Sequence, residues 1–83
     1  MPDLIFRVAD TFTIEGRGIV ATPAEWGTGS AHVGDAIVLR RPDGSEILAR
    51  VRDITYPQRE ILLPSSVTKS DVSAGTEIWT ADD

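Results

Sequence analysis

The residues that could carry acid–base or nucleophilic chemistry are few in this chain. There is a single histidine, His32, and there is no cysteine. His32 can be grouped on paper with Ser65, Ser66 and a carboxylate as a hydrolytic set, but nothing in their spacing favours one. A zinc site needs histidine or cysteine partners at matching spacing, and the chain lacks them. We therefore predict no metal site and no bound cofactor.

The remaining polar groups indicate no reaction either. The carboxylate pairs Asp53–Glu60 and Asp82–Asp83 have no spacing that implies a mechanism. The only lysine, Lys69, is not preceded by the glycines of a phosphate-binding loop, so we expect no GTP hydrolysis. The sequence therefore predicts a binding protein and not an enzyme.

Length and composition indicate one small domain. The chain has 83 residues, of which 41% are apolar, enough for one compact core. We expect a single domain over 1–83, with its core in 4–80 and a frayed tail at 81–83. The amino terminus has no basic stretch followed by an apolar run, and no window is long enough to span a membrane. Together with the lack of cysteine, this predicts a cytoplasmic protein with no membrane partner.

The charge distribution favours a protein partner over a nucleic acid. The formal net charge is −5, which repels phosphate backbones unless positive charge gathers on one face. Arg40–Arg41 is the only basic pair, and Asp43 follows it closely. Most other arginines also have acidic neighbours, which is typical of solvated strands of mixed charge.

Short apolar runs separated by turn residues predict an all-β fold, either a barrel or a sandwich. Pro42-Asp43-Gly44 is a strong hairpin signal, and 65–74 is expected to be a loop containing at most one helical turn. Closure into a barrel would leave no exposed sheet edges. Six strands are predicted, at 4–14, 17–22, 36–40, 46–54, 60–63 and 76–80.

The first strand alternates apolar and polar residues, as expected for a half-buried strand. Phe12 and Ile14 fall on its apolar face, so they are predicted to be core residues or, alternatively, to line a pocket. The pattern alone is more typical of the core. Asp10 interrupts the apolar face, and we interpret it as a bulge that re-aims the residues after it.

A glycine corner joins the first two strands. Gly16 and Gly18 flank Arg17 where backbone freedom is needed. Arg17 could contact a ligand phosphate, but we favour bonds to backbone carbonyls or to a carboxylate. Pro23 cannot donate a ladder hydrogen bond, so we expect it to end the second strand or to lie at an edge.

The two tryptophans have different expected roles. Trp26 falls in 24–30, a segment rich in glycine and small polar residues, and is either a binding anchor on a loop or a cover for one end of the barrel. Trp79, in the last predicted strand, is expected to be a core residue or to cover the barrel.

The glycine corner also carries a resemblance to a known family. Residues 10–22, DTFTIEGRGIVAT, resemble the start of the second domain of elongation factor Tu and other translational GTPases, which reads Asp-Val-Phe-x-Ile-x-Gly-Arg-Gly-x-Val-x-Thr-Gly. Residues 33–35 resemble that family's Val-Gly-Asp turn, 51–54 its central strand, and 73–78 its Ala-Gly-Asp-x-Val ending. The resemblance covers about 4–80.

This resemblance implies a six-stranded antiparallel Greek-key barrel without its own GTPase domain. In elongation factor Tu the barrel holds the aminoacylated end of transfer RNA. Where the family has a glutamate and an arginine that help to hold the terminal nucleotide, this chain has Thr55 and Gln58. The residues that the resemblance assigns to a ligand or partner site are Asp10, Phe12, Ile14, Arg17, Val20 and Thr22.

Three functional hypotheses follow. The first is a non-catalytic module that engages a protein through the corner face and Trp26. The acidic charge and the replacement of the nucleotide-holding residues favour this one. The second is recognition of a transfer RNA end or of single-stranded RNA, and the third is a structural subunit or homo-oligomer.

Overall fold

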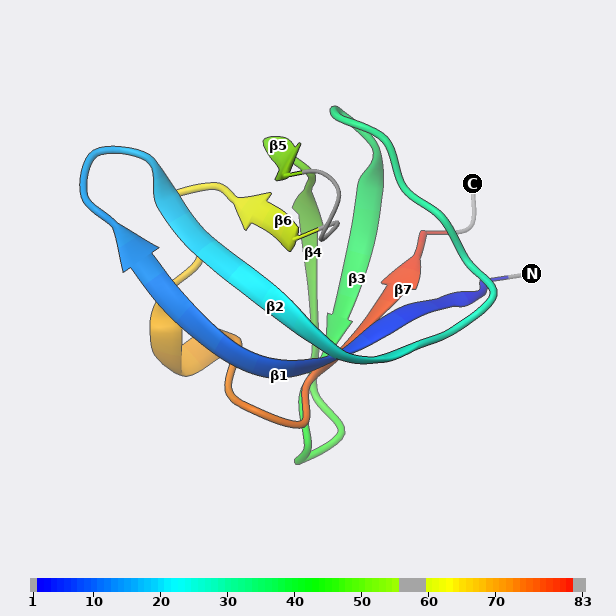
Figure 1. Ribbon diagram of the computed structural model, residues 1–83. Helices are drawn as coiled ribbons and strands as arrows, with labels where there is room; N and C mark the ends of the chain where they lie inside the picture. The colour runs from blue at the N-terminus through cyan, green and yellow to red at the C-terminus, as the bar shows by residue number, and fades with distance from the viewer. Residues whose placement is uncertain (1, 56–59, 82–83) are drawn as a thin grey trace.

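The computed structural model describes residues 2–55 and 60–81 and is all-β, as predicted. In this part of the chain, seven antiparallel strands form one sheet, and a single 3₁₀ turn is the only helical element (Figure 1). The elements are β1 (Leu4–Ile14), β2 (Gly18–Trp26), β3 (Ala36–Arg40), β4 (Glu46–Arg50), β5 (Asp53–Thr55), β6 (Glu60–Leu63), the 3₁₀ helix η1 (Lys69–Asp71) and β7 (Glu77–Thr80).

The strand order in the sheet is β4-β3-β7-β1-β2-β6-β5, so the two edge strands are consecutive in sequence. The predicted strand 46–54 is in fact two strands, because the chain changes partner within it. The Val51 N–H donates to the Asp35 carbonyl at 2.9 Å, on the β3 side, whereas the next N–H, of Arg52, donates to the Leu62 carbonyl of β6 at 2.9 Å. One segment therefore supplies both edges of the sheet.

The hydrophobic core is built from one face of nearly every strand. Phe6, Leu39, Leu63 and Ile78 are among its fully buried side chains. The predicted loop at 65–74 contains η1 and contributes the buried Val67 and Val72 to the same cluster. The single helical turn expected in that loop is thus present, and its valines anchor it to the core.

A bulge in β1 changes which residues face the core. The pairing of β1 with β2 shifts between Val8 and Asp10, where the sequence predicted a bulge. Before the shift, Phe6 and Val8 are buried, whereas after it the odd-numbered Thr11 is buried instead. A shift of one residue moves every later side chain to the opposite face. The interpretation of Phe12 and Ile14 as core residues is therefore wrong, and both are exposed.

Strand β2 is longer than predicted and runs through Pro23 to Trp26. Pro23 pairs with Val8 at the irregular part of the ladder, where a missing N–H is tolerated. Pro23 therefore does not end the strand, and Trp26 lies in a strand and not in a loop.

The two ends of the described chain lie beside each other (Figure 1). The Asp3 N–H donates to Thr80 Oγ1 at 2.7 Å, and the Thr80 N–H donates to the Asp3 carbonyl at 2.8 Å. The Ala81 N–H still bonds to the Ala36 carbonyl at 3.3 Å, so the sheet holds this first residue of the predicted tail. The rest of that tail and the predicted turn at 56–58 lie outside the described residues.

Candidate functional site

The register of β1 against β2 gathers most of the predicted site on one face. Asp10 pairs with Thr22, and Phe12 pairs with Val20. Directly opposed residues project from the same side of a sheet, and so do residues two apart along a strand. We call this surface the hairpin face; its predicted members are Asp10, Phe12, Ile14, Val20 and Thr22.

The hairpin face has an apolar centre that is separate from the main core. Phe12 is 45% exposed and Ile14 is 36% exposed. Val20 pairs with Phe12 on one side and with Leu62 of β6 on the other. Val20 and Leu62 are buried, yet they are not part of the main core cluster. They therefore form the floor of the hairpin face, while Phe12 and Ile14 supply its accessible apolar surface.

Polar groups border this apolar centre. The Thr22 hydroxyl donates to the Asp10 carbonyl at 3.0 Å, and Asp10 Oδ1 accepts from the Thr11 N–H at 2.8 Å. Asp53 of β5 pairs with Leu62 and so extends the same row of residues. Sequence reasoning did not place Leu62 or Asp53 here, because their contribution depends on the pairing of β6 with β2.

The glycine corner brings Arg17 to the end of the hairpin face. Gly16 and Gly18 have φ angles of 78° and 136°, which confirms the predicted need for glycine. A Cβ at Gly18 would collide with the Leu63 carbonyl, so β2 approaches β6 closely at this point. The Arg17 guanidinium lies 3.7 Å from Asp53 Oδ2. Its partner is thus a carboxylate, as favoured from the sequence.

A shallow cleft of about 480 Å³ lies beneath the corner. Ile14 and Gly18 line it on the hairpin side, and Val67 and Lys69 line it on the side of the loop that carries η1. Arg17 also lines it, so two basic side chains border this cleft. Glu15 is a third charged neighbour, of opposite sign.

Trp26 belongs to a different surface. It pairs with Phe6, six residues before Phe12 along β1, and the two rings meet edge-on with centroids 5.2 Å apart. Trp26 is 44% exposed and lines a cavity of about 190 Å³, together with Ile54, Ile61 and His32. The structure therefore does not bring Trp26 to the hairpin face, and the two halves of the predicted contact surface are separate.

Among the described residues, side chains of opposite charge lie next to each other on the sheet, and no basic stripe forms. Arg40 Nε donates to Glu46 at 2.9 Å and stacks over the Trp79 ring at 4.9 Å, so Trp79 covers the outside of the sheet. Further ion pairs join Arg7 to Glu77 at 3.3 Å and to Glu25 at 3.7 Å. This arrangement agrees with the mixed-charge interpretation of the sequence.

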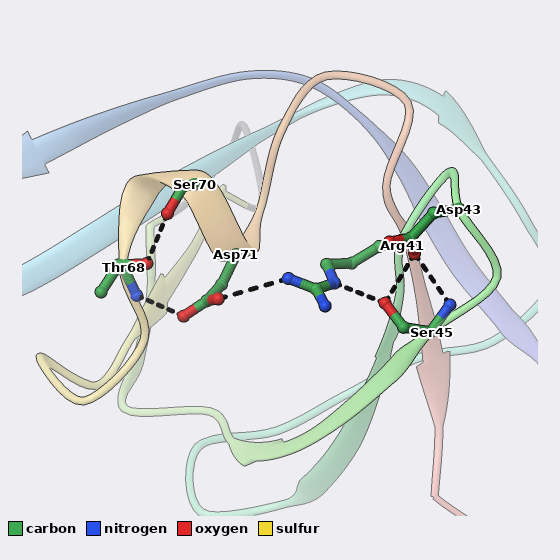
Figure 2. Close-up of polar contacts among 6 residues, drawn as sticks. All are labelled: Arg41, Asp43, Ser45, Thr68, Ser70 and Asp71. Atoms are coloured by element: carbon green, nitrogen blue, oxygen red, sulfur yellow. Dashed lines mark hydrogen bonds and ion pairs between the residues drawn. The ribbon is translucent and has the colours of Figure 1, made fainter.

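A second polar network connects the β3–β4 hairpin to η1 through Arg41 (Figure 2). Arg41 Nε donates to Ser45 Oγ at 2.6 Å, and Arg41 Nη1 lies 3.4 Å from Asp71 Oδ1. Ser45 in turn donates to Asp43 Oδ1 through its hydroxyl at 2.6 Å and its N–H at 2.9 Å. The sequence predicted the turn but not its bond to Asp71, which is 30 residues from Arg41.

Hydrogen bonds to their ionised forms lower the pKa of both aspartates in this network. For Asp43 the main cause is the Ser45 hydroxyl, followed by the Ser45 N–H and then by the charge of Arg41. For Asp71 the main cause is the Thr68 N–H, which donates to Oδ2 at 3.0 Å; the Thr68 hydroxyl and Arg41 add to it. Each donor favours the carboxylate over the carboxylic acid.

The groups considered for catalysis are not assembled. His32 lines the cavity next to Trp26, with Nδ1 3.6 Å from Asp35 Oδ2, whereas Ser65 lines the cleft beneath the corner. In residues 2–55 and 60–81, no three His, Asp or Glu side chains gather as a metal ion would need. Thr55 is exposed at the end of β5, and Gln58 lies outside the described residues.

No family model, curated protein or solved structure matches the chain. Within the described part of the chain, no helix has the length and apolar character required to cross a membrane.

Proposed function

We propose that this protein is a non-catalytic binding module whose hairpin face engages a protein partner. The observation that carries this proposal is the exposure of Phe12 and Ile14 on an ordered strand, above the buried pair Val20 and Leu62. Aromatic and aliphatic side chains supported in this way are typical anchors at the centre of protein interfaces. Asp10, Thr22 and Arg17 supply a polar rim around them.

We further propose that the sheet closes into a small barrel resembling the second domain of elongation factor Tu. Support comes from the edge strands β4 and β5, which are joined through Val51 and Arg52 alone. The successive hydrogen bonds of these two residues, first to the β3 side and then to β6, are those expected where one bent strand completes a barrel.

A protein partner fits the charge of this face better than RNA does. The net charge is −5, and Asp10 and Asp53 both lie on or beside the hairpin face. Arg17 is already paired with Asp53. An RNA partner, the second candidate, is favoured only by the basic side chains Arg17 and Lys69 at the neighbouring cleft.

Quantitative affinity capture with matched variants tests the protein hypothesis. Phe12→Ser should remove the captured partner without changing the fold, since the side chain is exposed. Val33→Ser is the control, because Val33 is also apolar and is 61% exposed but lies outside the hairpin face. Equal capture by both variants, or no partner that depends on Phe12, would contradict the proposal.

Binding of labelled transfer RNA tests the second candidate. Affinity that depends on phosphate contacts falls steeply between about 50 and 200 mM salt. We expect no such binding. If it occurs, and if Arg17→Gln weakens it while Phe12→Ser does not, the RNA function replaces the protein one.

A further inference from the structure

Strand β4 is an edge strand with hydrogen-bonding capacity left over. Among the described residues, its only strand partner is β3. At the two ends of this ladder, the Val51 N–H donates to the Asp35 carbonyl and the Arg41 N–H donates to the Ser45 carbonyl. The odd-numbered residues of β4 therefore form the hydrogen-bonded pairs with β3. Because hydrogen-bonded pairs alternate in an antiparallel ladder, Glu46, Leu48 and Arg50 direct their backbone groups away from β3.

The same three residues share the outer face of the sheet. Leu48 is 72% exposed, the largest value among the large apolar side chains in the described chain. It pairs with Val38, which pairs with Trp79, which in turn pairs with Leu4. An apolar row therefore crosses four strands and ends at the free edge of β4 with its most exposed member.

The charges on β4 are arranged with opposite signs about Leu48. Glu46 lies two residues before it and Arg50 two residues after it, on the same face. If a second β4 strand lies antiparallel with its Leu48 opposite this one, each Glu46 faces Arg50 of the partner subunit. Opposite charges directly across a ladder are favourable, and like charges are not.

We propose that β4 is a self-association edge at which two copies of this chain pair antiparallel about Leu48. In this register the residues that would exchange hydrogen bonds are Glu46, Leu48 and Arg50, the three whose backbone groups point outward. Such an interface is isologous, because both copies use the same patch. The apolar rows of the two sheets become continuous across it.

The existing partners of these charges are compatible with the pairing. Glu46 accepts from Arg40 through one carboxylate oxygen, and Arg50 donates to the Gly34 carbonyl at 3.1 Å through one of its nitrogens. A second oxygen and further N–H groups remain for the contact across the edge. The inference does not rest on the proposed function, since β4 contributes nothing to the hairpin face. The proposed barrel closure is compatible with it, because the pairing with β6 begins at Arg52 and leaves the outer side of residues 46–50 unpaired.

Analytical ultracentrifugation over a range of concentrations tests the proposal. The mass should rise from one chain toward two, and Leu48→Lys, which places two like charges at the symmetry axis, should weaken association by about tenfold or more. Val33→Lys is the control, because Val33 is similarly exposed but lies outside β4. Thermal melts of the dilute variants should match, since neither side chain is buried.

Charge exchange tests the register itself. Glu46→Arg alone and Arg50→Glu alone should each weaken association, and the double variant should restore it. The repulsion that Glu46→Arg introduces against Arg40 is present in both the single and the double variant, so the restoration isolates the contact between subunits. Amide exchange at Glu46, Leu48 and Arg50 should also slow as concentration rises, with no change at Ile47 and Ala49.

Two results would overturn the proposal. One is a protein that remains monomeric at about 1 mM, a concentration at which even weak association would be detected. The other is self-association that Leu48→Lys leaves unchanged, which would place the contact elsewhere on the molecule.

Discussion

The turn between β1 and β2 and the turn between β3 and β4 both reverse the chain between antiparallel strands, but they are held by opposite means. At the first, the Arg17 N–H bonds to the Ile14 carbonyl at 3.0 Å, and Gly18 fits against the Leu63 carbonyl. At the second, the Gly44 N–H bonds to the Arg41 carbonyl at 2.9 Å, and polar side chains add the rest (Figure 2).

The first turn thus depends on the absence of a side chain at Gly18. The second depends on hydrogen bonds among the side chains of Arg41, Ser45 and Asp43. Gly44 has a φ of 91°, but a Cβ there would have no atom within 4 Å. At the first turn the only polar side-chain contact among the described residues is the ion pair of Arg17 with Asp53 of β5, 3.7 Å apart. Glu15 and Arg17 are both exposed beside the hairpin face.

The largest effect is expected at the first turn. Gly18→Ala forces an alanine to adopt a φ of 136° and drives its Cβ into the Leu63 carbonyl, so β2 and β6 must separate. We expect the free energy of unfolding to fall by about 3 kcal/mol or more. Urea denaturation followed by circular dichroism measures this change.

Gly44→Ala is the matched control for that substitution. It also places an alanine at a positive φ, here 91°, but its Cβ meets no other atom, so we expect a loss of only about 1 kcal/mol. Equal losses at the two glycines would show that the close approach of Gly18 to β6 contributes little to stability.

The stability that the second turn contributes should depend on pH. Because the folded-state pKa values of Asp43 and Asp71 are lowered, their ionised forms stabilise the fold above the ordinary aspartate pKa of about 4. This contribution is lost as the pH falls through the lowered values. Arg41→Gln should therefore be destabilising at pH 7, by less than Gly18→Ala, and should approach the native protein in stability near pH 2.

Arg52→Gln provides the charge control for this prediction, because Arg52 is exposed and lies outside the network. Unfolding curves of both variants at pH 7 and at low pH make the comparison. If the difference between Arg41→Gln and the native protein is independent of pH, Arg41 acts through packing and not through the two aspartates.

The sequence identifies local structure well at these two turns because the signals there are local. Glycines around Arg17 and the Pro42-Asp43-Gly44 run constrain the backbone directly, and the strands at 36–40 and 60–63 have the predicted bounds. A bulge near Asp10 was also predicted correctly, and the shift in pairing lies between Val8 and Asp10. The alternation of apolar and polar residues in β1 did not predict the face on which Phe12 lies, because that face depends on how the bulge shifts the pairing with β2.

Contacts between distant segments were beyond prediction for a related reason. Leu62 and Asp53 join the candidate site only through the pairing of β6 with β2 and β5. Asp71 meets Arg41 only because Val67 and Val72 pack that loop into the core. These contacts have no local sequence pattern, because a single carboxylate or leucine does not indicate which distant segment it will contact.

The smallest effect is expected at Thr76. Its hydroxyl has no hydrogen-bond partner in the described part of the chain, whereas the polar side chains of the Arg41 network do, so it tests whether an unpaired polar group adds stability. Thr76 follows the loop that carries Asp71, and its hydroxyl is fully buried without a partner among the described residues. Thr76→Val keeps the shape of the side chain and removes the unsatisfied oxygen, so stability should stay equal or rise by up to about 1 kcal/mol. Thermal unfolding at pH 7 measures the change. A clear loss of stability would mean that this hydroxyl is bonded in solution, and the contrast with the Arg41 network would then disappear.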